Sequence, residues 1–433
     1  MNRQTWRRAS VCALALSCLA APVAATPPTS DDLVRRAVDL TPDAAGHLEA
    51  ARAARLSADA VGWLPRPTVA LRTEWMPSEQ RHLLVASQMW RWADQRAAER
   101  APLAAGERSA RLTRLAARLD AASGLRRLLI ELQGARIAAD AARAHAARLD
   151  ALAARITAGV TGAMTTAGEL AMLRSEQAMA AARIAEAESM ARGAAAMVEA
   201  LVGAPLPEPP LDPADPLLAD LTPAALDKPL PAPSTADAHP AIAAMRADAD
   251  AMRADARMAD LERRPEPMLE AGLGAQVMDS PHSGASTDLM AMLELSVPLP
   301  TQAARFDAGR DAALARARAM ELAADAEARM RRARLAEVTA RLRDAAARLD
   351  DQSRSLLPAA TAAWQSRVTD AARGVFDMAG SMAALDRLAA AERDQVMLRA
   401  EAWRLTVELD DLSGGAWAQA HGWYTPATDE VAP

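Results

Sequence analysis

Two long segments with almost no proline set the fold class of this chain. They run from Ala93 to Val202 and from Ala303 to Leu412, and the second is interrupted at Pro358. Apolar residues recur in both at three- and four-residue spacing, the period of an amphipathic helix. Each segment is too long for one helix of a globular domain and predicts two helices of about 55 residues packed as a coiled-coil hairpin. The sequence therefore predicts a mainly α-helical fold built from long antiparallel helical hairpins.

A small β part is expected just before each helical segment. Residues 69–75 and 269–277 alternate between apolar and polar or small side chains, the period-two pattern of a strand. The expected return strands are 83–90 and 288–297, with turns at 77–80 and 279–287. Each half of the chain thus predicts one β-hairpin, within residues 68–90 and 268–298.

The chain also repeats itself around a proline-rich linker at 205–236. Pro65-Arg66-Pro67 recurs as Pro265-Glu266-Pro267, and the segment Gly162–Gly168 recurs as Gly374–Gly380. Internal similarity of this kind indicates duplicated structural units. We expect a first repeat at 26–204 and a second at 237–414, each with a helix, a hairpin and long helices. A C-terminal tail follows at 415–433.

The first 25 residues predict export. Arg3, Arg7 and Arg8 precede an apolar stretch, and Val23-Ala24-Ala25 is a small-residue cleavage site. The alternative is a lipoprotein cleaved before Cys18. Both cysteines lie in this leader, so cleavage after Ala25 leaves the mature chain without a thiol. After the leader, no uncharged apolar run reaches the roughly 18 to 20 residues of a membrane-spanning helix.

Composition and motifs exclude several functions. The formal net charge of −6 argues against nucleic acid as a partner. Lys228 is the only lysine, so there is no P-loop, and the six histidines form no catalytic motif. We therefore expect no enzyme, no cofactor and no metal site. Four methionines could bind a soft metal, but their spacing better fits an apolar stripe in a helical seam; they are Met172, Met179, Met190 and Met197.

Four strands cannot by themselves cross a membrane. A barrel with a lumen needs at least about eight strands, and an open sheet edge in lipid leaves backbone amides unpaired. If the chain inserts, three copies would supply about twelve strands, with their helices continuing as a tube. The residues equally allow a helical protein in water with two small surface hairpins.

Several sequence fragments, taken in their order along the chain, favour insertion into a membrane over a helical protein in water. Pro65-Arg66-Pro67 precedes a strand, Ser87-Gln88 ends the return strand, and Leu356-Leu357-Pro358 precedes the last helices. Ser296-Val297-Pro298-Leu299-Pro300 is followed by Arg305–Arg310. Together they resemble the TolC-like outer-membrane efflux channels, nearest the heavy-metal (cobalt-zinc-cadmium type) subgroup.

The resemblance implies a homotrimer with a twelve-stranded barrel in outer-membrane lipid and an α-helical barrel in the periplasm. Such a channel is passive and works with a periplasmic adaptor and an inner-membrane efflux pump. The alternative is a soluble periplasmic coiled-coil adaptor or scaffold. The sequence argues against an adaptor, because no lipoyl-like or small β-barrel segment flanks a single hairpin.

The resemblance also implies two sets of site residues. The ends of the helical hairpins would form the periplasmic gate and the adaptor docking site, with an acidic ring of three Asp377 residues compensated by cations or by arginines such as Arg367. The glycines of the two segments Gly162–Gly168 and Gly374–Gly380 could instead serve only to permit close packing of the helices. The gate candidates are Gly162, Gly168, Arg367, Gly374, Asp377 and Gly380, and the candidates for the membrane interface are Trp75, Trp90 and Trp92.

Overall fold

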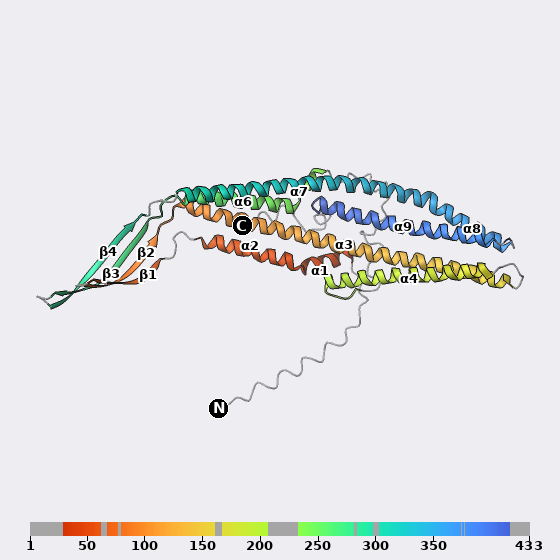
Figure 1. The fold of residues 1–433 in the computed structure, drawn as a ribbon, viewed down its shortest axis with the longest axis horizontal. Helices are drawn as coiled ribbons and strands as arrows, with labels where there is room; N and C mark the ends of the chain where they lie inside the picture. The colour runs from red at the N-terminus through yellow and green to blue at the C-terminus, as the bar shows by residue number, and fades with distance from the viewer. Residues whose placement is uncertain are drawn as a thin grey trace, which may run out of the picture. The chain divides into compact units, whose positions relative to one another are not determined.

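The computed structural model shows a mainly helical chain with one four-stranded antiparallel sheet (Figure 1), which confirms the predicted fold class. The predicted leader lies outside the described residues, as do most of the proline-rich linker and of the C-terminal tail. The structure describes residues 29–61, 67–76, 79–160, 167–206, 233–280, 284–297, 303–373, 375 and 377–415.

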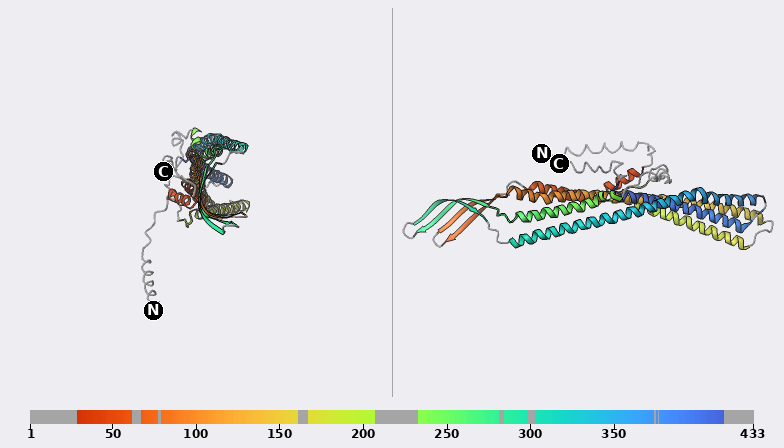
Figure 2. Two further views of the ribbon diagram at one scale, coloured as in Figure 1. Left: turned by 90° about the vertical axis from the view of Figure 1, so that its left-hand side faces the viewer. Right: turned by 90° about the horizontal axis from the view of Figure 1, so that it is seen from above.

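The two predicted hairpins form a single sheet. Strands β1 (Thr68–Met76) and β2 (Glu79–Met89) are the first hairpin, and β3 (Met268–Ser280) and β4 (Gly284–Ser296) are the second. The order is β1-β2-β3-β4, so β2 and β3 join the hairpins, as Figure 2 also shows. Segments far apart in the sequence therefore share one ladder of backbone hydrogen bonds.

Both predicted turns are wrong in extent. The turn expected at 77–80 is shorter, because β2 begins at Glu79, which pairs with Met76. The loop expected at 279–287 is mostly strand, because β4 begins at Gly284, which pairs with Ser280. Polar side chains at these positions suggested loops, but strand pairing uses backbone amides, which any residue except proline supplies. The extra length of the second hairpin thus lies largely in its strands.

The described residues of the first half of the chain form four helices. The predicted pair of equal helices is instead one of 68 residues, which ends at Val160, and one of 36, which begins at Ala167. A short helix that the sequence analysis did not anticipate begins at the N-cap Thr29, which forms a capping box with Asp32. The helices are α1 (Ser30–Asp39), α2 (Pro42–Ala60), α3 (Ala93–Val160) and α4 (Ala167–Val202).

In the second half, the predicted interruption at Pro358 is a π-helical turn rather than a break. Pro358 is the second residue of a helix, where its missing amide leaves no hydrogen bond unmade, and the π turn precedes it. The elements are the 3-10 helix η2 (Pro233–Ala238), α6 (Pro240–Leu261), α7 (Ala303–Asp351), the π turn η3 (Gln352–Leu356), α8 (Leu357–Ala372) and α9 (Met378–Leu412).

The chain forms two compact units, and each contains segments of both halves. The first comprises Met1–Leu40, Gly124–Thr222 and Ala346–Arg404, and the second comprises Thr41–Ser123, Pro223–Ala345 and Leu405–Pro433. The compact units therefore cut across the two sequence repeats, whose boundaries stay a prediction.

Each unit has its own apolar core. In the first unit, α3, α4 and α9 share a cluster around Leu149, Leu173 and Leu385. In the second, Ile242 of α6 packs with Ala324 and Ala328 of α7. Within the described residues, no helix is both long enough and apolar enough to span a membrane.

Candidate functional site

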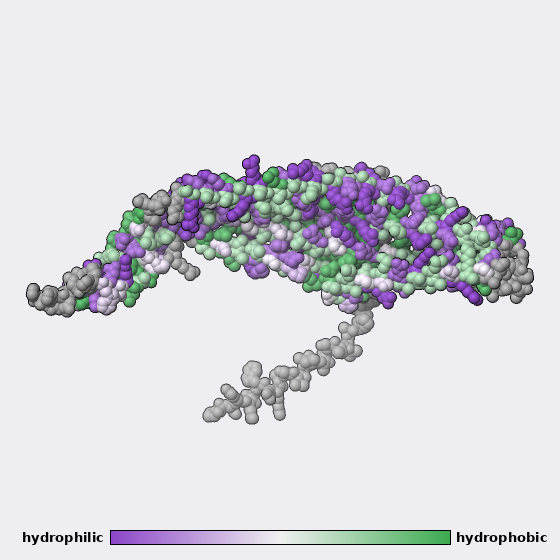
Figure 3. All heavy atoms as spheres, viewed as in Figure 1, coloured by the Kyte–Doolittle hydropathy of each residue, from purple (hydrophilic) through white to green (hydrophobic). Residues whose placement is uncertain are grey.

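One face of the sheet is apolar and exposed. Cross-strand pairing aligns Leu71 with Leu84, Leu84 with Leu273, and Leu273 with Ala291. Exposure reaches 72% at Leu71 and 89% at Leu289, and apolar side chains are visible along the strands in Figure 3. A contiguous apolar surface of this kind marks a contact with a partner or with lipid. Its large exposed members are Val69, Leu71, Trp75, Leu84, Leu269, Leu273, Leu289, Leu293 and Leu295.

The apolar face also includes the polar residues Thr73, Gln80 and His82, and the opposite face carries most of the charged side chains. Arg72 and Glu74 of β1 form an ion pair of 3.1 Å there, and the other charged members include Glu270, Asp288 and Glu294. The alternation expected from the sequence thus separates the two faces of the sheet.

Two apolar residues of β2 are buried on this polar face. Leu83 and Val85 lie opposite Gly274 and Gly272 of β3. A Cβ atom on Gly272 would lie 3.4 Å from Cγ2 of Val85, and one on Gly274 would collide with the backbone carbonyl oxygen of His82. The two glycines therefore allow β2 and β3 to approach closely.

The sheet has two open edges within the described chain. Strand β1 pairs only with β2, and β4 pairs only with β3, so the outer backbone groups of both have no strand beside them. The strands contain 9, 11, 13 and 13 residues. Such edges are ready to pair with another chain.

The three predicted tryptophans lie at two ends of the sheet. Trp75 pairs with Gln80 beside the first turn and is 71% exposed. Trp90 and Trp92 follow β2 at the other end and are 48% and 45% exposed. Exposed tryptophans therefore border the apolar face at both ends.

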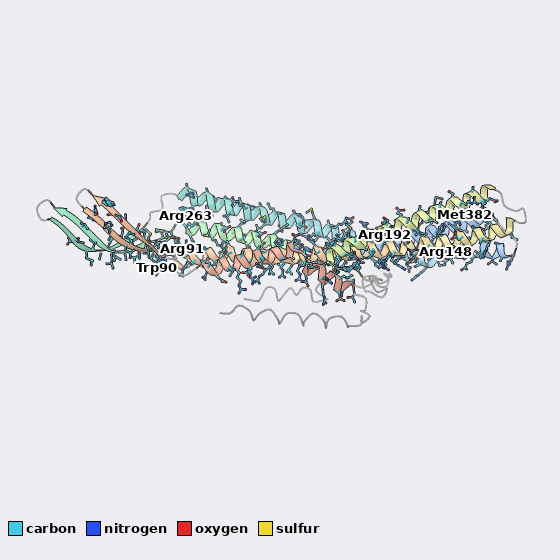
Figure 4. The ribbon with its side chains drawn as sticks, turned by 90° about the horizontal axis from the view of Figure 1, so that it is seen from below. Trp90, Arg91, Arg148, Arg192, Arg263 and Met382 are labelled. Atoms are coloured by element: carbon cyan, nitrogen blue, oxygen red, sulfur yellow. The ribbon has the colours of Figure 1, made fainter. Side chains whose placement is uncertain are left out.

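Side chains from distant segments fix the junction of the sheet with the helices (Figure 4). The backbone amide of Trp90 donates to the carbonyl oxygen of Pro267 at 2.8 Å, and Nε1 of Trp92 donates to that of Pro265 at 3.2 Å. The buried Gln95 donates through Nε2 to the carbonyl oxygen of Leu261 at 3.1 Å. The sequence analysis missed Gln95, because its partner is 166 residues away in the chain.

Charged pairs reinforce the same junction. Arg91, which Figure 4 labels beside Trp90, forms ion pairs with Glu99 at 2.5 Å and with Glu266 at 3.7 Å. Arg264 is paired with Asp94 at the start of α3. The Pro265-Glu266-Pro267 element singled out in the sequence is therefore held against the start of α3.

The structure brings three of the six predicted gate residues together. Asp377 is the residue before α9, and its Oδ1 accepts a hydrogen bond from the backbone amide of Gly380 at 3.0 Å. Its Oδ2 accepts one from Nη1 of Arg367 in α8 at 3.1 Å. A Cβ atom on Gly380 would collide with the Asp377 carboxylate. Glycine here leaves room for both the N-cap and the ion pair.

Of the other three gate candidates, only Gly168 lies within the described residues. Gly168 is an exposed residue in the first turn of α4. Gly162 and Gly374 lie outside the described residues. Within one chain, Asp377 pairs with Arg367, and its carboxylate is a helix cap as well as a charge.

The ends of the two helical hairpins share one apolar core. It contains Leu173 of α4, Met378 and Met382 of α9, and the half-buried Trp364 of α8 packs against it. Figure 4 labels Met382 in this region. The regions around Gly168 and Gly380 therefore begin helices that pack into a common cluster.

A half-buried ion pair also joins the two hairpins. Arg148 of α3 donates from Nη1 and Nη2 to the two carboxylate oxygens of Glu392 in α9, at 2.7 and 2.6 Å. Such bidentate pairs fix geometry as well as adding energy. The sequence analysis did not find this pair, because its two residues are 244 positions apart and meet only when the helices pack.

Comparison with known proteins identifies the fold. No protein-family model matches the sequence, and no curated protein matches it. Among solved structures, the outer-membrane channel OprN has a TM-score of 0.71 and 18% identity and matches 90% of this chain and 91% of its own. CusC, whose structures concern transmembrane channel formation, has a TM-score of 0.70 and 17% identity. The match covers 90% of this chain and 92% of CusC.

The outer-membrane protein VceC of Vibrio cholerae is also similar, with a TM-score of 0.70, 16% identity and coverage of 89% of this chain and 96% of its own. At this identity the likeness concerns the fold alone. It extends over nine-tenths of the chain and includes both the sheet and the helices. The chain therefore has the fold of outer-membrane channel proteins.

Proposed function

We propose that this protein is the outer-membrane channel of a tripartite efflux system and belongs to the TolC-like family. The observation that carries the proposal is a sheet with one apolar exposed face and two open edges. Three copies would pair β1 of one chain with β4 of the next and close a barrel of about twelve strands. The apolar face would contact outer-membrane lipid, and the polar face would line the lumen.

The dimensions of the sheet support this placement. Its strands contain 9 to 13 residues, and a membrane-spanning strand needs about 9 to 11. Trp75 at one end and Trp90 and Trp92 at the other match the two aromatic borders of a membrane protein. We assign these three residues to the membrane interfaces and the helices to the periplasm.

The ends of the helical hairpins are the proposed periplasmic gate and adaptor docking site. The assignment covers Gly162, Gly168, Arg367, Gly374, Asp377 and Gly380 and rests on the resemblance to the channel family. Because Arg367 pairs with Asp377 in the same chain, a ring of three Asp377 residues would be partly neutralised. The proposed partners are two further copies of the chain, a periplasmic adaptor and an inner-membrane pump.

Transport through such a channel is passive, and the pump supplies the energy. The solved structures of similar fold are channels rather than enzymes. Heavy-metal efflux is the finer proposal, and it rests on the sequence fragments that resemble the cobalt-zinc-cadmium type subgroup. Comparing the metal and drug sensitivities of a deletion strain tests it: selective metal sensitivity is expected, and selective drug sensitivity would contradict the subgroup.

Cysteine crosslinking tests the trimer. Val69 on β1 and Leu295 on β4 are both exposed, and within one chain they are separated by β2 and β3, or about 14 Å at the usual strand spacing. Replacing both by cysteine in a mature chain without other thiols allows a short bismaleimide to join β1 of one copy to β4 of the next. The expected product in membranes is a ladder that ends at three chains.

The single variants Val69→Cys and Leu295→Cys are the controls and should stay monomeric under denaturing conditions. If the double variant also gave only monomers while a monofunctional maleimide labelled both thiols, the strand edges would not meet. That outcome would support the soluble adaptor or scaffold instead.

A further inference from the structure

A cavity in the first compact unit has properties that the proposed channel function does not explain. It has a volume of about 300 Å3 and lies between α3, α4 and α9, at the lower end of the range for small-molecule sites. Alanines form much of its wall, including Ala138, Ala180 and Ala389. Its polar lining comes from His145, Arg183, Glu186 and Arg393.

His145 is the main reason to expect a ligand. Its side chain lines the cavity and is only 3% exposed, and neither Nδ1 nor Nε2 has a hydrogen-bond partner in the described structure. A neutral imidazole has one N–H donor and one acceptor nitrogen. Leaving both unpaired in the interior is unfavourable, and buried polar groups in folded proteins are nearly always satisfied. The ring therefore lacks a partner that a bound molecule can supply.

The charges around the cavity define the class of ligand. Arg183 has no carboxylate within 4.0 Å in the described part of the chain, and Nε of Arg393 donates to the carbonyl oxygen of Ala389 at 3.4 Å. Glu186 is the only acidic residue in the lining, so the lining has a net positive charge. This arrangement favours an anion over a cation.

The protonation of His145 agrees with this. Burial is the main cause that lowers the pKa of the imidazole, and Arg183 and Arg148 lower it further, while Asp386 and Glu392 raise it. The ring is therefore neutral at pH 7 and can donate one hydrogen bond without adding a positive charge. Arg183 and Arg393 supply the charge.

We propose that this cavity binds a small organic anion with one carboxylate on an apolar body. The carboxylate accepts hydrogen bonds from the His145 ring and from Arg183 or Arg393, and the apolar body packs against the alanines. The ligand contacts α3 and α4 of one hairpin and α9 of the other, so its binding stabilises their packing. The proposal does not depend on the channel function.

Binding of three matched probes to the full-length mature protein tests the class of ligand. Benzoate, benzyl alcohol and benzylammonium have the same ring and differ in charge. Calorimetry should detect benzoate binding with millimolar affinity and binding of the other two at least about tenfold more weakly. The NMR signal of the His145 ring should shift on addition of benzoate.

Two variants that should change benzoate affinity in opposite directions test whether the ligand binds in this cavity. Arg183→Gln should weaken benzoate binding by about tenfold, whereas Glu186→Gln, which removes the negative charge, should strengthen it. The control His82→Leu changes an exposed histidine on the sheet and should have no effect. If Arg183→Gln fails to fold, the increase in benzoate affinity expected for Glu186→Gln still tests the location of the site.

Three results would overturn the proposal. The first is stronger binding of benzylammonium than of benzoate, which would mean that the charge of the site is wrong. The second is benzoate binding that neither Arg183→Gln nor Glu186→Gln alters, which would place the ligand elsewhere. The third is no benzoate binding at millimolar concentrations, which would leave water as the partner of His145.

Discussion

Replacing Leu273 by arginine tests directly whether the apolar face of the sheet lies in lipid. Leu273 is near the middle of β3, is 65% exposed, and has Leu84 and Ala291 beside it on the neighbouring strands. Because this side chain is largely exposed in the described structure, arginine fits sterically in either setting. The change in stability caused by Leu273→Arg therefore depends on whether water or lipid surrounds this face.

The two settings predict effects of different size. If the face is in water, substitution at an exposed site away from special features changes the free energy of unfolding by no more than about 0.5 kcal/mol. If the face lies at the middle of a bilayer, arginine destabilises the folded protein by about 2–4 kcal/mol per chain, or about 6–12 kcal/mol for a trimer. The difference exceeds the error of a denaturant titration.

The assay is refolding from urea into phosphatidylcholine vesicles, followed by tryptophan fluorescence and by electrophoretic mobility. Asp288→Arg is the control, because Asp288 is exposed on the opposite face, on the neighbouring strand β4. We expect a clear loss of stability for Leu273→Arg and little change for Asp288→Arg. Equal effects of the two substitutions, whether large or small, would refute the assignment of the apolar face to lipid.

Three further predictions concern single residues. Gly274→Ala should destabilise the sheet in the same refolding assay, because the new Cβ collides with a backbone oxygen. The control Gly309→Ala lies in α7 with open space around it and should stabilise the protein by about 0.5–1 kcal/mol. Equal effects of the two substitutions on stability would contradict the close approach of β2 and β3. Burial, with a smaller contribution from Arg331, lowers the pKa of His239 to about 3. Because the unfolded chain binds a proton below about pH 6.5 and the folded chain does not, stability should fall by roughly 2 kcal/mol between pH 7 and pH 5. His239→Asn can keep the N-cap and should remove this loss in thermal melts; an unchanged pH dependence would show that His239 is not its source. Asp377→Asn can retain the cap on α9 and removes the charge, whereas Asp377→Ala loses both and about 0.5–2 kcal/mol of stability. A changed conductance and weaker cation block in both variants would support the gate, and a conductance equal to wild type in Asp377→Asn would place this carboxylate away from the pore.

The sheet shows what local patterns can and cannot predict. The alternation at 69–75 and 269–277 predicted both hairpins and their faces, because successive side chains of a strand point to opposite sides. The turns were misjudged, because Glu79 and Ser286 are polar yet belong to the backbone ladder. The pairing of β2 with β3 was not predicted either, since it depends on how distant segments meet.

In the candidate site, too, local features were predictable from the sequence and contacts between distant segments were not. The glycine segments 162–168 and 374–380 were expected at the ends of the helical hairpins, and α4 begins at Ala167 and α9 at Met378. The lengths of the helices were not predicted, and Pro358 lies in the first turn of α8 instead of ending a helix. The partners of Gln95, Arg148 and His145 were not predictable, because their environments form only when separate helices pack. Arg148 and Glu392, for example, are 244 residues apart in the sequence.

The methionine stripe of α4 adds a second reason to expect assembly. Its spacing indicated an apolar seam, yet Met172, Met179, Met190 and Met197 are 53%, 41%, 63% and 59% exposed. The described helices of the same chain therefore leave much of this seam exposed. The open edges of β1 and β4 lack partners in the same way, although they belong to the other compact unit. Backbone pairing in the sheet and apolar burial on α4 are independent requirements, and neighbouring copies of the chain in the proposed trimer would satisfy both.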